Sequence, residues 1–230
     1  LRPDGKTEVA VEYNEDLSRA LRFAAVLIST QHSPDIALED VRSQVREQVL
    51  EPVLDGFGLD YSKARIVINR TPFIQGGPHS DAGLTGRKVV VDTYGGIGSH
   101  GGGAFSGKDP HKADRSEAYA ARWAAKNIVA AGLAHRAQVT LGFILGQGAP
   151  VSIDVETYGT EQVPREIIQK AVEQVFDFRL LSIIDQLDLE RPIYYKTAAY
   201  GHFGHDDPDY TWEKTDKVDA LKEAVQRIRL

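Results

Sequence analysis

The residues best suited to chemistry lie in a glycine-rich stretch near the middle of the chain. Residues 102–108, GGAFSGK, match the phosphate-binding pattern G-x-x-x-x-G-K as far as its lysine. Glycines let a ligand approach the backbone closely, and consecutive N–H groups can surround an anion. Lys108 and Lys112 add point charges that suit phosphate oxygens, and Arg87 adds a guanidinium that binds two oxygens at once. These residue types predict a site for phosphate or a nucleotide.

The stretch departs from a true P-loop directly after the lysine. A P-loop continues with Ser or Thr, whose hydroxyl holds Mg²⁺, and it enters a helix at once. Here Asp109 and Pro110 follow, and the proline disfavours a helical conformation at Asp109. We therefore expect Lys108 to bind phosphate on a different scaffold. Asp114 is either a carboxylate ligand for Mg²⁺ or the cap of the next helix, and its two oxygens allow both roles.

The charge distribution favours a small anionic ligand. Residues 87–116 contain five basic and three acidic residues, a balance of +2, whereas the 230-residue chain has a net charge of −6. This contrast argues against a general nucleic-acid partner. Without cysteine the chain forms no disulfide or thiolate metal site. No apolar run approaches the roughly 18 residues of a membrane span, and no signal peptide is visible, so we expect a cytoplasmic protein without a membrane partner.

Each feature also has a plain structural interpretation. Residues 95–107 contain seven glycines in thirteen positions and are expected to form a loop, which would serve equally as a flexible linker. Single lysines are usually solvated. Arg87 and Lys88 would also suit an edge strand, where charged side chains prevent pairing with another chain. The residues alone therefore indicate an anion or nucleotide site without identifying the ligand.

Periodicity indicates the elements that position these residues. Alternating or short apolar runs predict strands at 7–13, 65–69, 87–92, 138–145 and 151–157, while 21–29 fits a buried strand or a helix. Amphipathic spacing predicts helices at 37–54, 114–131, 166–176, 180–187 and 217–229. Valines spaced by four mark the first helix, and Asp114 with Glu117 has the spacing of a capping box at the second. The pattern predicts an α+β fold with helices over mixed or antiparallel sheets, divided near residues 73–75.

Several long motifs resemble the methionine adenosyltransferase, or S-adenosylmethionine synthetase, family. They follow the family's order along nearly the whole chain and comprise STQHS (29–33), DAGLTGRKVVVDTYGG (81–96), GGGAFSGKDPHKADRSEAYAARWAAKNIVAAGL (101–133), VSIDVETYGT (151–160), TAAYGHFG (197–204) and WEKTDK (212–217). The resemblance implies three similar α+β domains around a pseudo-threefold axis. Residues 1–74 would be the second half of the central domain and residues 75–230 the C-terminal domain. The chain starts at Leu1 and contains no methionine, so we expect its N-terminal portion to be missing.

The resemblance also implies a reaction and a set of site residues. Family enzymes join ATP and L-methionine into S-adenosylmethionine and release the triphosphate, which is then hydrolysed to pyrophosphate and phosphate. The motif match implies four roles for the site residues. Arg87, Lys88 and Lys108 would hold the triphosphate and act in catalysis, and Phe73 and Ala104 would line the ATP site. Asp81 and Lys112 would face methionine, with Asp81 also touching the nucleoside, and Asp114 would hold Mg²⁺. The resemblance further implies two Mg²⁺ per site, K⁺, and a homodimer or homotetramer with active sites between subunits.

One segment departs from the family's pattern. The family usually has Asn-Pro-Ser/Thr-Gly-Arg-Phe, whereas residues 69–73 read NRTPF, one residue shorter and with Pro72 in place of the arginine. His79 and Ser80 replace the usual Met-Gly. Adenine recognition is thus the role that the motifs support least. The alternatives are an inactive relative acting as a regulatory or assembly subunit and a nucleotide hydrolase of another family. Because the family's catalytic His-Pro-Asp motif belongs to an earlier region, we expect the 230-residue chain alone to be inactive.

Overall fold

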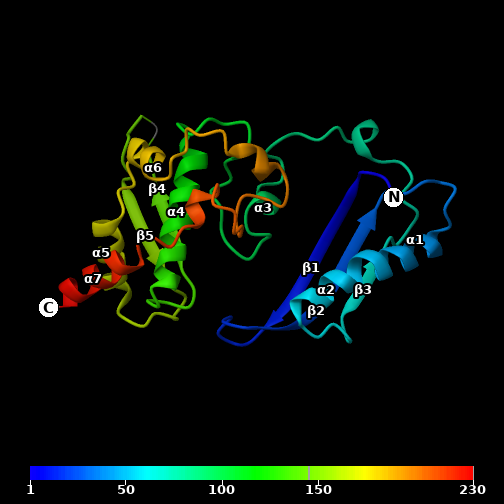
Figure 1. Ribbon diagram of the computed structural model, residues 1–230, viewed down its shortest axis with the longest axis horizontal. Coiled ribbons are helices and arrows are strands. Elements are labelled where there is room, and N and C mark those ends of the chain that lie inside the picture. The colour runs from blue at the N-terminus through cyan, green and yellow to red at the C-terminus, as the bar shows by residue number, and fades with distance from the viewer. Residues whose placement is uncertain (145, 230) are drawn as a thin grey trace. The chain divides into compact units, whose positions relative to one another are not determined.

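The computed structural model describes residues 1–144 and 146–229 and divides into two compact units (Figure 1). The first unit comprises Leu1–Gly83 and the second comprises Leu84–Leu230. A 3₁₀ turn, Gly77–His79, lies near the end of the first unit. Among the described residues, no helix is both long and apolar enough to span a bilayer.

A three-stranded mixed sheet forms the first unit. Strands β1 (Gly5–Tyr13) and β2 (Ala20–Thr30) are antiparallel, with Val9 opposite Val26, and β3 (Arg65–Ile68) pairs with β2 in parallel. The apolar run that fits either a strand or a helix is therefore the central strand of the sheet. Phe23 and Val26 of this strand are buried in the core of the first unit, whereas Leu21 and Leu27 are exposed, so only part of the apolar run is covered. The helical segment between β2 and β3 lies along the sheet (Figure 1).

That helical segment contains one wide turn. Helix α1 (Leu38–Val45) continues through a π-helical turn, Arg46–Leu50, into α2 (Glu51–Phe57), so the predicted helix is confirmed. The buried residues are Val41, Val45, Leu50 and Leu54, whereas Val49 and Val53 are exposed. A spacing of four drifts by about 40° per step around an α-helix, so four valines spaced in this way cannot share one face. The π turn adds a residue per turn and brings Leu50 onto the face of Val45.

Helix α4 is the centre of the second unit. It spans Ala113–Ala130, close to the predicted bounds, and Gly132 follows it with φ of +70°. The antiparallel strands β4 (Gln138–Gly142) and β5 (Ser152–Glu156) confirm the two predicted strands, although Leu145, the predicted end of the first, lies outside the described residues.

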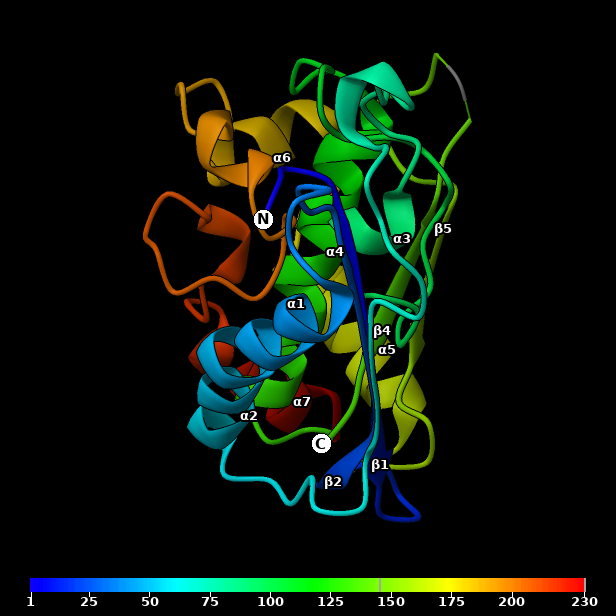
Figure 2. The same cartoon turned by 90° about the vertical axis from the view of Figure 1, so that its right-hand side faces the viewer.

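Three further helices complete the core of this unit. They are α5 (Arg165–Val175), α6 (Leu180–Gln186) and α7 (Val218–Arg229), all close to prediction (Figure 2). Helix α4 packs against β4, α6 and α7, and α5 packs against β5 and α7. Two 3₁₀ turns, Tyr194–Ala198 and Thr211–Glu213, lie in the long segment before α7. The mixed helices and small sheets confirm the α+β class.

The predicted strand at residues 87–92 is wrong. This segment contains a short helix, α3 (Val89–Asp92), and no described strand pairs with it. The N–H groups of Asp92 and Thr93 donate to the carbonyls of Lys88 and Val89, and the Thr93 hydroxyl donates to Val89 O at 2.7 Å. Three valines favour a strand only where a neighbouring strand accepts their hydrogen bonds. Without such a neighbour, the backbone satisfies its polar groups locally.

Candidate anion-binding site

The glycine-rich loop is anchored by a buried aromatic side chain. Phe105 is buried in the core of the second unit, and the N–H of Lys108 donates to its carbonyl at 3.2 Å. Gly107, with φ of +82°, lies between them in a left-handed conformation that glycine adopts without strain. This turn places Lys108 next to a buried anchor, five residues before α4 begins.

Two other glycines bring separate segments against this loop. A Cβ added to Gly86 would lie 2.2 Å from the Cβ of Ala104, and one added to Gly103 would lie 2.3 Å from Asp114 Oδ1. No side chain fits at either position, so both contacts require glycine. The residues just before Arg87 therefore touch the loop at Ala104, and the loop touches the start of α4 at Asp114.

Lys108 and Asp114 form an ion pair. The Lys108 ammonium donates to Asp114 Oδ2 at 2.5 Å, and about half of the Asp114 side chain is exposed. Helix α4 begins at Ala113 without any side-chain cap, so the predicted capping box is wrong. The carboxylate that would have capped the helix is engaged by Lys108. The structure thus brings together the predicted phosphate ligand and the predicted metal ligand.

Arg87 and Lys88 directly follow the contact of Gly86 with Ala104. Both are exposed and have no ionic partner within residues 1–144 and 146–229. Lys112 is exposed too, but it lies 3.6 Å from the Asp109 carboxylate. Unpaired cations in a segment that contacts a glycine-rich loop favour an anionic ligand.

Glu117 lies beside the candidate site, and its sequence spacing indicated only a capping role. It lies one turn after Asp114 on α4, and burial, with a smaller contribution from the Asp114 charge, raises the pKa of Glu117 to about 7. The described residues contain no group of three His, Asp or Glu side chains able to hold a metal ion. A cation here would rest on Asp114 and on oxygens of the bound ligand, an arrangement common for Mg²⁺.

Phe73 and Asp81 belong to the first unit. The Phe73 N–H donates to His32 Nε2 at 3.2 Å, and its carbonyl accepts from the His32 N–H at 2.9 Å. Its ring packs on Gly76, where an added Cβ would lie 2.7 Å from Cε2. Asp81 is exposed and accepts from the Gly83 N–H at 3.0 Å. Phe73 and Asp81 therefore lie in the first unit, whereas Lys108 and Asp114 lie in the second.

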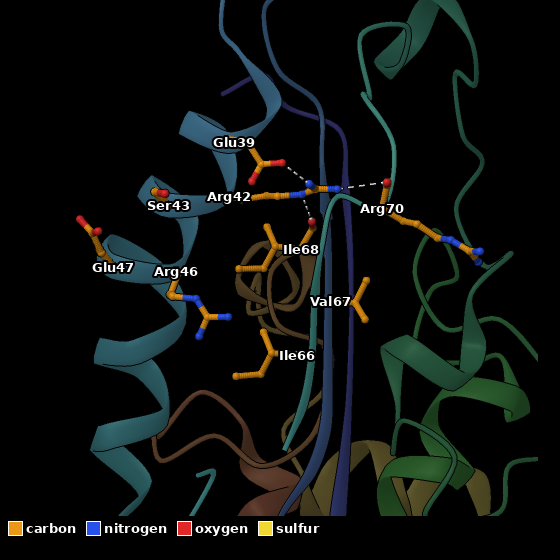
Figure 3. Close-up of a pocket in the computed structure, with 9 residues that line it drawn as sticks. All are labelled: Glu39, Arg42, Ser43, Arg46, Glu47, Ile66, Val67, Ile68 and Arg70. Atoms are coloured by element: carbon orange, nitrogen blue, oxygen red, sulfur yellow. Dashed lines mark hydrogen bonds and ion pairs between the residues drawn. The ribbon is translucent and has the colours of Figure 1, made fainter. Parts of the chain in front are cut away.

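Arg42 fixes the segment that departs from the family's pattern. Its guanidinium lies in a groove between α1 and β3 and donates to the carbonyls of Ile68, Asn69 and Arg70 (Figure 3). The buried Asn69 side chain accepts from the Thr30 N–H at 2.7 Å and donates to its carbonyl at 2.8 Å, which supports its positive φ of 40°. Together with His32, these contacts hold both ends of residues 69–73.

Comparison with known proteins gives consistent matches. Residues 1–73 match the model of the S-adenosylmethionine synthetase central domain, and residues 75–214 match that of the C-terminal domain. The chain is 59% identical over 231 residues to the S-adenosylmethionine synthase of Bifidobacterium adolescentis, covering 98% of this chain and 57% of that protein.

Two further relatives agree. The S-adenosylmethionine synthase of a Nocardioides species is 54% identical over 98% of this chain and 57% of its own length, and that of Corynebacterium kroppenstedtii is 53% identical over 99% and 58%. The chain thus spans less than two thirds of the length of these relatives. Both halves of the chain carry the family's domains, and the chain belongs to the S-adenosylmethionine synthetase family.

Proposed function

We propose that the protein forms S-adenosylmethionine from ATP and L-methionine and that Arg87, Lys88 and Lys108 bind the triphosphate of ATP. The observation that carries this proposal is the contact between Gly86 and Ala104, in a chain of this family. It joins the segment of Arg87 and Lys88 to the loop that ends at Lys108. Ala104 would line the ATP site, and Lys112 would face methionine. Phe73 and Asp81 would contact the nucleoside, with Asp81 also near methionine.

The chemistry explains why cations gather on one part of the substrate. The methionine sulfur attacks C5′ of the ribose, the C5′–O bond breaks, and its electron pair leaves with the triphosphate. The sulfur is already nucleophilic, so the step needs no general base. The developing charge falls on the leaving group, and fixed positive charge placed there is often the largest contribution to catalysis. Water then hydrolyses the triphosphate to pyrophosphate and phosphate.

Metal ions complete the proposal. Asp114 has an exposed carboxylate beside Lys108, and a single carboxylate plus phosphate oxygens suits Mg²⁺. Bound Mg²⁺ would neutralise part of the triphosphate charge. We expect two Mg²⁺ per site and K⁺, as the family resemblance implies.

We also propose a location and an assembly. The family resemblance implies a homodimer or homotetramer with active sites between subunits, and we propose the cytoplasm as its location. The chain spans 57–58% of the length of its relatives, so we expect the 230 residues alone to make no S-adenosylmethionine.

The test uses the full-length product of the gene with ATP, Mg²⁺ and K⁺, with and without L-methionine. Mass spectrometry should detect a sulfonium product only with methionine. Lys108→Ala should reduce the rate at least tenfold, because hydrogen bonds to charged groups contribute about 1.5–3 kcal/mol. Lys222→Ala, which removes an exposed lysine of α7, should leave the rate unchanged. Phosphate release that is indifferent to methionine would contradict the proposal.

A further inference from the structure

His202 contacts three segments that carry the proposed triphosphate site. It is fully buried, and its Nδ1 lies 2.8 Å from the hydroxyl of Tyr119 on α4. Its Nε2 lies 3.1 Å from Ser106 Oγ in the glycine-rich loop. Its backbone N–H donates at 2.8 Å to the carbonyl of Asp92, at the end of α3. These segments carry Asp114, Lys108 and the Arg87–Lys88 pair, respectively.

We propose that His202 is a positioning residue that fixes the glycine-rich loop, α3 and α4 relative to one another, and so sets the spacing of the cations that bind triphosphate. This inference rests on the proposed function. His202 touches neither substrate in this account and acts through Ser106, Tyr119 and the Asp92 carbonyl. None of the roles implied by the family motifs includes it.

The hydrogen bonds of this network have a defined direction. Burial, followed by the charges of Arg115 and His205, lowers the pKa of His202 to about 4, so the ring is neutral at pH 7 and has one N–H. Arg115 Nε donates to the Tyr119 oxygen at 3.1 Å, which leaves the Tyr119 O–H free to donate to Nδ1. Nε2 then carries the proton and donates to Ser106 Oγ.

The network holds the loop at two points. Besides its contact with Tyr119, Arg115 donates through its terminal nitrogen to the carbonyl of Lys108, and its guanidinium lies 3.8 Å from the centre of the Tyr194 ring. Ser106 is held from the other side by His202. The two held residues lie on either side of Gly107, whose backbone is otherwise the most permissive part of the turn.

The core could be filled at position 202 without the polar groups of His202. Phe105 packs edge-on against both His202 and Tyr119, with centroid distances of 5.1 and 5.6 Å, so an apolar ring at position 202 would also fill the core. Buried polar groups contribute little net stability but fix geometry when every partner is satisfied. Gly201 allows the approach to α3, because a Cβ there would lie 2.9 Å from the Asp92 carbonyl oxygen.

The experiment measures binding of inorganic tripolyphosphate to the full-length protein in Mg²⁺ by calorimetry. Ser106→Ala removes the contact with Nε2 without disturbing the core, and we expect it to weaken binding about five- to tenfold, the value of roughly one hydrogen bond. Ser106→Thr keeps the hydroxyl and should bind like the wild type. Tyr119→Phe should weaken binding by a similar factor. The double variant should be no weaker than the worse single variant, because both remove the same chain of contacts.

The matched control is Gln169→Ala. Gln169 lies on α5, which packs against β5 and α7, and its side-chain amide donates to Ile153 O at 3.1 Å. This variant should lower the melting temperature but not the affinity for tripolyphosphate. If Ser106→Ala binds as tightly as the wild type, or if Gln169→Ala weakens binding equally, His202 is a structural residue only and the inference is wrong. If the wild type itself does not bind tripolyphosphate, the proposed function fails first.

Discussion

At the scale of single residues, the proposed site requires Lys108 and Asp114 to exchange their partners. An ion pair this exposed contributes at most about 1 kcal/mol, so a phosphate and a metal ion could replace its partners at little cost. Lys108 would turn to the phosphate and Asp114 to the cation. The pair therefore holds both side chains near the site while no ligand is bound.

This exchange predicts opposite effects of Asp114→Asn with and without magnesium. Without Mg²⁺, the variant should bind tripolyphosphate as tightly as the wild type or more tightly, because Lys108 is released and a nearby negative charge is removed. With Mg²⁺, the gain in affinity that the wild type shows should be lost. Calorimetric titrations at matched ionic strength would measure both, with Asp154→Asn as a control at an exposed position of β5. A variant that retains the full magnesium effect would exclude Asp114 as a ligand.

Contacts between exposed candidate residues were easier to predict from the sequence than contacts of buried ones. Lys108 and Asp114 lie six positions apart, and their contact follows from local spacing. The contacts of His202 join it to residues 83 and 96 positions away, and no periodicity reports such distances. The sequence marked His202 only by its place in the TAAYGHFG motif, next to a glycine. Only the fold shows which residues it contacts.

At the scale of elements, the helix between β2 and β3 shows how one wide turn changes which residues lie on the buried face. The π turn comes just before Pro52, which has no N–H to donate to the preceding turn. The N–H of Glu51 donates instead to the carbonyl of Arg46, five residues back. The helix was predictable from its amphipathic spacing. The identity of its buried residues was not, because a regular helix was assumed.

Two valines of this helix provide a matched test. Val41 is 1% exposed and Val53 is 55% exposed. Val41→Ala should reduce the free energy of unfolding by about 2 kcal/mol, through lost apolar burial and the cavity left behind. Val53→Ala should change it by less than about 0.5 kcal/mol. Denaturant unfolding of the full-length variants under one protocol would measure both, and equal losses would contradict the assignment of Val41 to the buried face and Val53 to the exposed one.

The short helix α3 shows that strand propensity alone does not decide the local structure. Residues 87–92 contain three consecutive valines and read as a strand, yet Val90 and Val91 are exposed and unpaired in the described structure. Strand formation depends on a partner strand, which a local pattern does not contain. The long helix α4 was predictable because its apolar face and its terminal glycine are both local.

At the scale of the whole molecule, the chain has two units and an uneven distribution of charge. We propose residues 1–74 and 75–230 as its domains, near the boundary between the two family matches. An excess of positive charge in one segment of an acidic chain favours anion binding at that segment. We propose that this segment receives a departing triphosphate, not a single transferred phosphoryl group.

The most direct test follows the oxygen atom between C5′ and the α-phosphorus of ATP. ATP labelled with ¹⁸O at that bridging position would be supplied with L-methionine, Mg²⁺ and K⁺ to the full-length protein. If C5′–O breaks, the label leaves with the phosphates, and mass spectrometry should find it in inorganic phosphate or pyrophosphate and none in the nucleoside product. Label retained on the nucleoside would mean that a P–O bond breaks instead, and the account of Arg87, Lys88 and Lys108 as ligands of an expelled triphosphate would be wrong.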